Sequence, residues 1–90
     1  MKVCKLDGRQ RSKAAILSRI ARDLGFPGHF GGNLDALFDI LTTDIEGPFT
    51  VRWRPTANAR AALGADFGRI RSTLEDAARE RKDMTLDLAA

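Results

Sequence analysis

The stretch HFGGNLDALFDIL, residues 29–41, joins a glycine-rich loop to a short segment with helical periodicity. Asn33 is a candidate N-cap, because its side chain can accept a hydrogen bond from a free backbone N–H of the first turn. At 100° per residue, the apolar side chains of the segment gather on one stripe. The pattern therefore predicts a helix over 34–42 with one buried face. The stripe consists of Leu34, Leu37, Phe38 and Leu41.

The same predicted helix carries carboxylates on the flank of that stripe. Asp35 and Asp39 are four residues apart and therefore neighbours on the helix surface, with Thr42 beside them. Phe38 lies at the border between stripe and flank, so we expect its ring to be partly exposed. Two like charges at this spacing are mildly unfavourable, and the helix dipole favours only Asp35, in the first turn. The pair is either an ordinary solvated face or a preorganised acidic surface for a cationic partner.

Charge is distributed unevenly along the 90 residues of the chain. The formal net charge is +3, yet residues 29–47 contain four carboxylates and neither Lys nor Arg. Residues 1–28 contain seven cations and two anions, which accounts for much of the excess. The basic total suits weak affinity for nucleic acid, but the field is local and the central segment would repel phosphate.

On the N-terminal side of this stretch, the sequence predicts one strand and one helix. Residues 1–6 (MKVCKL) form a short strand candidate that ends at the turn-forming pair Asp7-Gly8. Ser12 is a candidate N-cap for the helix that follows. That helix is expected to end at Gly25, since glycine readily adopts the left-handed conformation found at helix C-termini.

On the C-terminal side, the sequence predicts two more strands separated by helices. Residues 48–53 (PFTVRW) alternate apolar and polar side chains, as in a strand with one covered face. Thr56 can cap a short helix that ends at Leu63, and a longer helix is expected over 66–81. Residues 84–88 (MTLDL) alternate again. This order leaves room for right-handed crossovers, so we predict an α/β fold with a small three-stranded parallel sheet flanked by about four helices.

Length and composition indicate one soluble domain, which we expect to span residues 1–90. There is no low-complexity tract and no visible internal repeat. The N-terminus lacks the apolar core of a secretory signal, and no apolar run is long enough to cross a bilayer. These features predict a cytoplasmic protein without membrane contact.

Few side chains in the sequence suggest catalysis. His29 is the only histidine, and a general-base pair with Asp35 is the one catalytic alternative, but no nucleophile, triad or metal-ligand spacing accompanies it. The single cysteine, Cys4, is expected to be a buried apolar side chain of the first strand. The glycines at 31–32 match neither a dinucleotide-binding loop nor a P-loop. We therefore expect no catalytic residues, no cofactor and no metal.

The opening stretch also resembles a known family. The pattern Gly-x-Asn-Leu-Asp-Ala-Leu-x-Asp at residues 31–39 is similar to that of the barstar family of ribonuclease inhibitors, and the likeness extends over essentially the whole chain. The resemblance implies three parallel strands and four helices, in agreement with the order predicted above. It also implies a cis peptide bond at Gly47-Pro48. The supporting positions are Phe30, Leu41, Pro48, Trp53, Arg54, Asp83 and Thr85.

In that family, the second helix and the loop before it plug a ribonuclease active site, with carboxylates in place of RNA phosphates. The resemblance assigns this role to Asp35 and Asp39, which would meet cations of the enzyme. It implies further anionic contacts from Asp76 and Glu80, four residues apart on the last predicted helix. It thus indicates a non-enzymatic inhibitor, of the immunity or antitoxin type, that is monomeric when free and binds a cationic ribonuclease. The same face would include His29, Gly31, Asn33, Phe38 and Thr42.

The chain departs from the family pattern at three positions of this stretch. His29 replaces an aromatic ring of the best-known member, Gly32 an acidic residue and Phe38 a tryptophan. The chain is also basic where that member is acidic, so we expect the partner to be a ribonuclease other than barnase, with a nuclease toxin of another type as the alternative. The alternative function is a small basic nucleic-acid-binding domain, although no RNA-binding aromatic signature is present and a solvated surface is the default for its arginines. Those arginines are at positions 52, 54, 60, 69 and 71.

Overall fold

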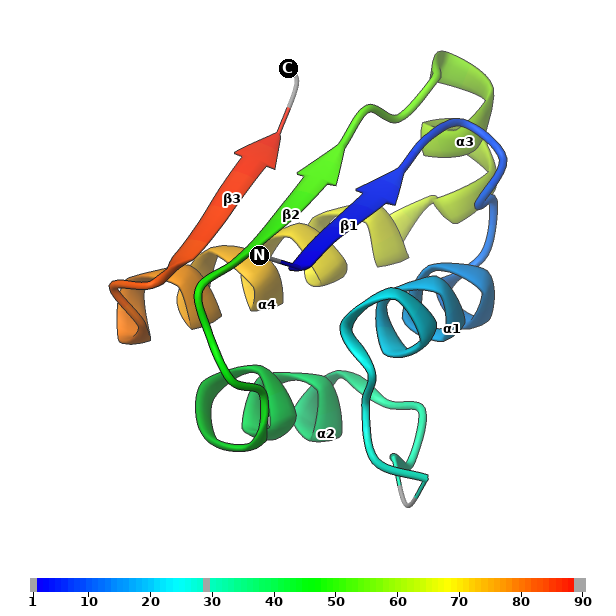
Figure 1. Cartoon of the computed structure of the whole chain (residues 1–90). Coiled ribbons are helices and arrows are strands. Elements are labelled where there is room, and N and C mark those ends of the chain that lie inside the picture. Colours follow the sequence, from blue (N-terminus) through cyan, green and yellow to red (C-terminus); the bar gives the residue numbers. More distant parts are fainter. Residues whose placement is uncertain (1, 29, 89–90) are drawn as a thin grey trace.

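The computed structural model describes residues 2–28 and 30–88, which form three parallel strands and four α-helices (Figure 1). The α/β fold predicted from the sequence is therefore confirmed. An additional turn of π-helix, η1, continues α2. The elements are β1 (Lys2–Leu6), α1 (Lys13–Leu24), α2 (Leu34–Asp39), η1 (Ile40–Asp44), β2 (Phe49–Trp53), α3 (Ala57–Leu63), α4 (Ala65–Glu80) and β3 (Met84–Leu88).

β2 is the central strand of the sheet and pairs in parallel with β1 on one side and β3 on the other. Its side chains alternate as predicted, since Phe49, Val51 and Trp53 have no exposed surface whereas Arg52 is exposed. The covered face of the sheet is the one beneath which α1 and α4 lie (Figure 1). The opposite face carries polar side chains in contact with solvent.

The core between sheet and helices is built from apolar side chains of every layer. Cys4 is fully buried in β1, as expected, and burial raises the pKa of its thiol to about 12, so it remains a protonated apolar group. The helical part of the core consists of Ile16, Leu17, Ile20, Leu24, Leu37, Ile40, Leu41, Leu63, Ile70, Leu74 and Ala77.

Polar caps set the helix limits at the predicted positions. The hydroxyl of Ser12 accepts a hydrogen bond from the N–H of Ala15 (3.1 Å) at the start of α1. The hydroxyl of Thr56 likewise accepts a hydrogen bond from the N–H of Ala59 (3.1 Å) at the start of α3. Gly25 and Gly64 follow α1 and α3 with φ of 71° and 56°, a conformation that side chains with a Cβ adopt only with strain.

The helix predicted over 34–42 differs from the observed one in form and length. The regular α-helix ends at Asp39, and a wider π-type turn then continues to Asp44. In this turn the N–H of Ile45 donates to the carbonyl of Ile40, five residues back (3.1 Å). Threonine hydroxyls of the turn bond to carbonyls one turn earlier and compete with the regular backbone ladder, an effect that apolar periodicity does not register.

Other element limits differ from the prediction by one residue. The helix expected over 66–81 is observed as α4 and stops earlier because Arg81 is extended (φ −122°, ψ 125°). The strand expected over 48–53 begins one residue later, since Pro48 has no N–H to donate to a sheet ladder. The Gly47-Pro48 peptide is cis, as the family resemblance implied. No helix in the described part of the chain is long and apolar enough to cross a membrane.

A largely covered ion pair joins two turns of α1. The carboxylate of Asp23, 17% exposed, accepts hydrogen bonds from Nε of Arg19 (2.9 Å) and Nε of Arg22 (3.3 Å). Burial alone would raise the pKa of this carboxyl, but the two guanidinium groups outweigh it and hold the pKa below the ordinary value of 3.8. Ionised Asp23 therefore stabilises the folded chain.

This pair predicts a specific pH dependence of stability. Because the pKa of Asp23 is lower folded than unfolded, its contribution is complete above about pH 4 to 5 and is lost as the pH falls through the folded-state value. We expect Asp23→Asn to be less stable than wild type at neutral pH, with a difference that shrinks toward about pH 3. Urea unfolding followed by the fluorescence of buried Trp53, the only tryptophan, measures this. A difference that is the same at every pH would contradict the account, and Glu80→Gln is the control.

Candidate functional site

The two predicted inhibitory carboxylates lie on the exposed flank of α2. Both Asp35 and Asp39 are exposed, while Leu37 and Leu41 on the opposite side of the helix have no exposed surface. The side-chain oxygen of Asn33 accepts a hydrogen bond from the first turn (2.7 Å), which confirms its predicted capping role. The core and the cap therefore fix the orientation in which α2 presents its acidic flank.

The loop before α2 is fastened by aromatic contact. The rings of Phe26 and Phe30 meet edge to face, with centroids 5.1 Å apart and planes at 89°. The N–H of Phe30 also donates to the carbonyl of Pro27 (3.1 Å). Gly32 has φ of +73° with open space around it, so the turn favours glycine for its backbone conformation. His29, predicted to face the partner, lies outside the described residues.

A small hollow of about 260 Å³ opens beside Asp39. Gly31 from the loop lies at its edge, so the structure brings this predicted site residue next to the carboxylate. Phe30 and Ile40 give the hollow an apolar lining, and Asp44 adds a second carboxylate. The arrangement suits a cationic side chain with an apolar stem, such as arginine or lysine.

The predicted site residues Phe38 and Thr42 lie at the junction of α2 and η1. Phe38 is half-buried and packs against the core, in agreement with its expected border position. The hydroxyl of Thr42 donates to the carbonyl of Phe38 (2.8 Å), so its proton is already engaged and only oxygen lone pairs remain for a partner. The neighbouring hydroxyl of Thr43 donates to the Asp39 carbonyl and to a carboxylate oxygen of Asp44 (3.0 Å).

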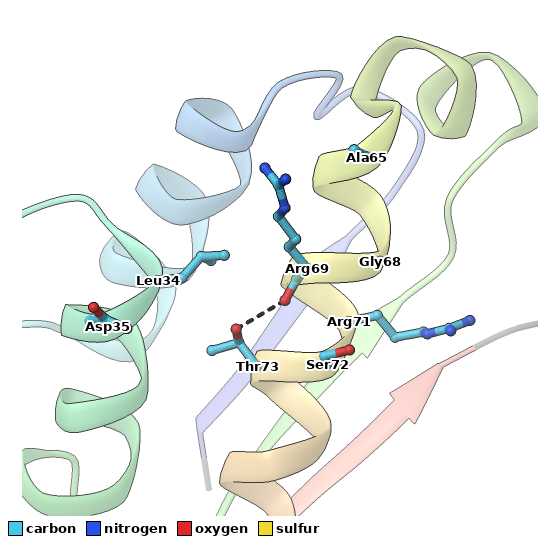
Figure 2. A pocket seen from close by; sticks show the side chains of 8 residues that line it. All are labelled: Leu34, Asp35, Ala65, Gly68, Arg69, Arg71, Ser72 and Thr73. Carbon is cyan, nitrogen blue, oxygen red and sulfur yellow. Dashed lines mark hydrogen bonds between the residues drawn. The ribbon is translucent and has the colours of Figure 1, made fainter.

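A shallow groove of about 570 Å³ separates the start of α2 from α4. Figure 2 shows Leu34 and Asp35 on one side of it and Arg69 and Thr73 on the other, with the Thr73 hydroxyl donating to the Arg69 carbonyl (2.9 Å). The Arg69 side chain is 69% exposed, and its ion pair with Asp66 is 3.7 Å long. The predicted partner-binding face is therefore not uniformly acidic, because folding places a cation across the groove from Asp35.

The two remaining predicted carboxylates lie on the same side of α4 as this groove. Glu80 follows Thr73 by seven residues, and Asp76 follows Arg69 by seven, so each lies two turns farther along the helix face that lines the groove. At the far end, Arg81 donates to the carbonyl of Leu41 (2.9 Å), which shows that α2 and α4 run in the same direction. Asp76 and Glu80 thus lie alongside the second half of the α2–η1 segment.

The charges of Asp76 and Glu80 are not equally available. Asp76 forms an ion pair with Arg79, one turn farther along α4. Within residues 2–28 and 30–88, Glu80 takes part in no ion pair, and neither does Asp35 or Asp39. These three predicted site carboxylates therefore meet solvent without an internal cation.

The chain is similar in sequence to known proteins. The family model described as "Barstar (barnase inhibitor)" matches residues 1–89. The chain belongs to the barstar family. A curated relative, "Putative ribonuclease inhibitor YrdF" of Bacillus subtilis (strain 168), is 32% identical over 79 residues, which cover 87% of each chain. These matches confirm the resemblance seen at residues 31–39, and both descriptions name an inhibitor.

Two charged residues beside the site were not singled out in the sequence. Asp44 was counted only as part of the acidic segment, because the predicted helix ended before it and the wide turn that carries it was not anticipated. Arg69 was assigned to solvated surface, since its position on the predicted helix gives no sign that its side chain lies opposite Asp35. In the described part of the chain, no group of three or more His, Cys, Asp or Glu side chains is arranged to hold a metal ion.

The cap of α2 is directly testable. We expect Asn33→Ala to lower the free energy of unfolding by about 1 kcal/mol, because the first turn loses its side-chain acceptor. Asn33→Ser and Asn33→Asp should retain most of the stability. Urea denaturation followed by Trp53 fluorescence compares the three variants, and an Ala variant as stable as wild type would refute the capping role.

Proposed function

We propose that this chain inhibits a basic ribonuclease by laying the exposed flank of α2, together with the loop before it, over the active site of the enzyme. Membership of the barstar family supports ribonuclease inhibition. The observation that carries the mechanism is the state of Asp35 and Asp39, two exposed carboxylates on a capped helix without an ion-pair partner in the described residues.

The chemistry follows from what a ribonuclease active site binds. Such a site holds RNA phosphates with arginine, lysine and histidine side chains, and a carboxylate can replace a phosphate oxygen in charge-assisted hydrogen bonds. Asp35 and Asp39 need not break internal ion pairs before binding, so little of the binding energy is lost to rearrangement. The helix then excludes RNA sterically as well as electrostatically.

The neighbouring residues extend this contact. The hollow beside Asp39 would take the stem of an arginine or lysine against Phe30 while the cation meets the carboxylate. Thr42 and Gly31 would line the same contact, and His29 would pack at its edge. Glu80 would supply a further anion from α4, and Asp76 a weaker one because Arg79 already neutralises part of its charge.

The charge of the whole chain bears on the identity of the partner. With a net charge of +3, the chain has a weaker long-range attraction for a basic enzyme than an acidic inhibitor would have. Arg69, across the groove from Asp35, would favour a neutral or acidic group at that place on the enzyme. We therefore propose a cognate ribonuclease other than barnase, matched to this mixed pattern of charge.

The rival function, nucleic-acid binding, finds little support in the described arginines. Arg52 and Arg54 both contact the carboxylate of Asp87 (3.3 and 2.9 Å), and Arg60 lies over the ring of Phe67 (4.8 Å from the centroid). These cations already have partners within the chain. They do not form the open basic stripe with stacking aromatics that is typical of RNA-binding surfaces.

The central test compares alanine substitutions of two aspartates, which change the net charge by the same amount. Asp39→Ala should weaken inhibition by at least about 30-fold, or about 2 kcal/mol. This is the usual threshold for a hot-spot residue, and barstar is itself one of the proteins from which hot-spot energies are known. Asp87→Ala, on β3 beside Arg52 and Arg54, should change it only a few-fold. The measurement is the inhibition constant for RNA cleavage by the ribonuclease that co-purifies with the wild-type chain, with barnase assayed in parallel.

Equal effects of the two substitutions would refute the site. Steep salt-dependent binding of RNA by the wild-type chain, retained in the Asp35→Ala/Asp39→Ala double variant, would instead support the nucleic-acid alternative.

Electrostatic steering by the acidic flank predicts a salt-sensitive association rate. The rate constant should fall as ionic strength rises from about 0.1 to about 1 M, because the screening length shortens from about 10 to about 3 Å. In the Asp35→Ala/Asp39→Ala double variant this dependence should be largely lost. Stopped-flow mixing with the same ribonuclease measures both, and a wild-type rate independent of salt would argue against steering.

A further inference from the structure

Arg81 has a largely covered guanidinium between three segments of the chain. Its side chain is only 14% exposed, although it stands at the end of α4. Nη1 donates to the carbonyls of Leu41 (2.9 Å) and Ile45, which lie in and just after η1. Nε and Nη2 donate to the two carboxylate oxygens of Asp83 (2.8 Å each). One side chain thus ties the end of the α2–η1 segment to the connection between α4 and β3.

The partners of Arg81 account for its burial. A helix ends with carbonyls that have no donor within the helix, and the guanidinium binds one of these, that of Leu41 in η1, together with the carbonyl of Ile45 just after it. The negative end of a helix favours a cation. The carboxylate of Asp83 balances the charge in a bidentate geometry that arginine, with its planar fork of N–H groups, can satisfy and lysine cannot. The ring of Phe49 covers the group, 4.9 Å from its centroid to Cζ.

The segment between η1 and β2 packs closely against the ion pair of Arg81 and Asp83. A Cβ at Gly47 would overlap the carboxylate of Asp83 and come within 2.9 Å of Nη2 of Arg81. The backbone at this position is therefore pressed against the pair. Glycine at residue 47 is required by this close approach and not by a left-handed conformation.

The π-type turn η1 needs contacts from outside its own backbone to hold it in place. π-type turns are rare, and the regular α-helical ladder stops at Asp39, five residues before the end of η1. The regular ladder offers little to hold this end of the segment in place. The tertiary contacts of Arg81 with Leu41 and Ile45 supply a restraint from α4 instead.

We propose that Arg81 is a positioning residue for the inhibitory surface: by binding the Leu41 and Ile45 carbonyls it fixes η1 against α4. This sets Thr42 and the neighbouring Asp39 at a constant distance from the carboxylates of α4. The functional part of this inference rests on the proposed ribonuclease inhibition, whereas the structural part can be tested on the free protein. Arg81 itself touches no partner.

The first experiment measures amide hydrogen exchange of the free protein, resolved by segment. In Arg81→Ala, exchange over residues 40–46 should accelerate at least tenfold more than exchange over β2 and α1, since local opening of η1 no longer breaks the tertiary bonds. Arg81→Lys should lie between the Ala variant and wild type. Gly47→Ala, which displaces Asp83 and Arg81 without removing a charge, should accelerate the same segment and remains informative if Arg81→Ala folds poorly.

Arg54→Ala is the matched control. Arg54 also bonds to a carbonyl and a carboxylate oxygen of one aspartate, Asp87 (3.1 and 2.9 Å), but at the sheet and away from η1. It should leave residues 40–46 as protected as in wild type. Uniform acceleration over all elements in both Arg81→Lys and Gly47→Ala, or unchanged exchange over residues 40–46, would overturn the positioning role.

The second experiment is a double-mutant cycle of inhibition. If Arg81 acts through the position of the acidic flank, the loss caused by Arg81→Ala should be at least threefold smaller in an Asp39→Ala background than in wild type. Additive losses would overturn the functional part of the inference. A wild-type chain that inhibits no ribonuclease would instead count against the proposed function, and the exchange result would still stand.

Discussion

The covered face of β2 is the constraint on which the rest of the structure depends. Phe49, Val51 and Trp53 have no exposed surface, and both other strands take their register from this strand. α1 and α4 are required to cover that face, because it is the largest apolar surface of the sheet. Since α4 is fixed there and α2 packs along it, the buried stripe of α2 points inward. The acidic flank is then left to solvent.

The positions of the charges in the fold show how an acidic segment fits into a basic chain. Residues 29–47 contain no fixed cation, and folding supplies one at each end of the segment from the region of α4. Arg69 stands across a groove from Asp35, and Arg81 binds carbonyls at the end of η1. Neither neutralises a carboxylate of the flank. Arg81 contacts the segment only through backbone carbonyls, and Asp35 and Asp39 remain free of internal ion pairs in the described chain, so the total of +3 says little about this surface.

Local signals predicted the fold well, because each depends on neighbouring residues. Asn33, Ser12 and Thr56 cap helices where their side chains suggested it, and the alternation of residues 49–53 gave the central strand. The wide turn after Asp39 was missed because the bonds made there come from threonine hydroxyls and from Arg81, which is forty residues away from Leu41. Arg69 was missed for a similar reason, because it is 34 residues away from Asp35 in the sequence. Apolar periodicity indicates which face of an element is buried, but it does not indicate which side chains from distant parts of the sequence lie beside that element.

The central claim is that the α2 flank occupies the active site of a ribonuclease. A crystal structure of the chain bound to the ribonuclease that it inhibits tests this most directly. The account predicts the Asp39 carboxylate at about 2.7 to 2.9 Å from an arginine or lysine nitrogen of the active site, with α2 buried in the contact. A complex in which Asp35 and Asp39 remain exposed, and another face such as the open side of the sheet meets the enzyme, would contradict it.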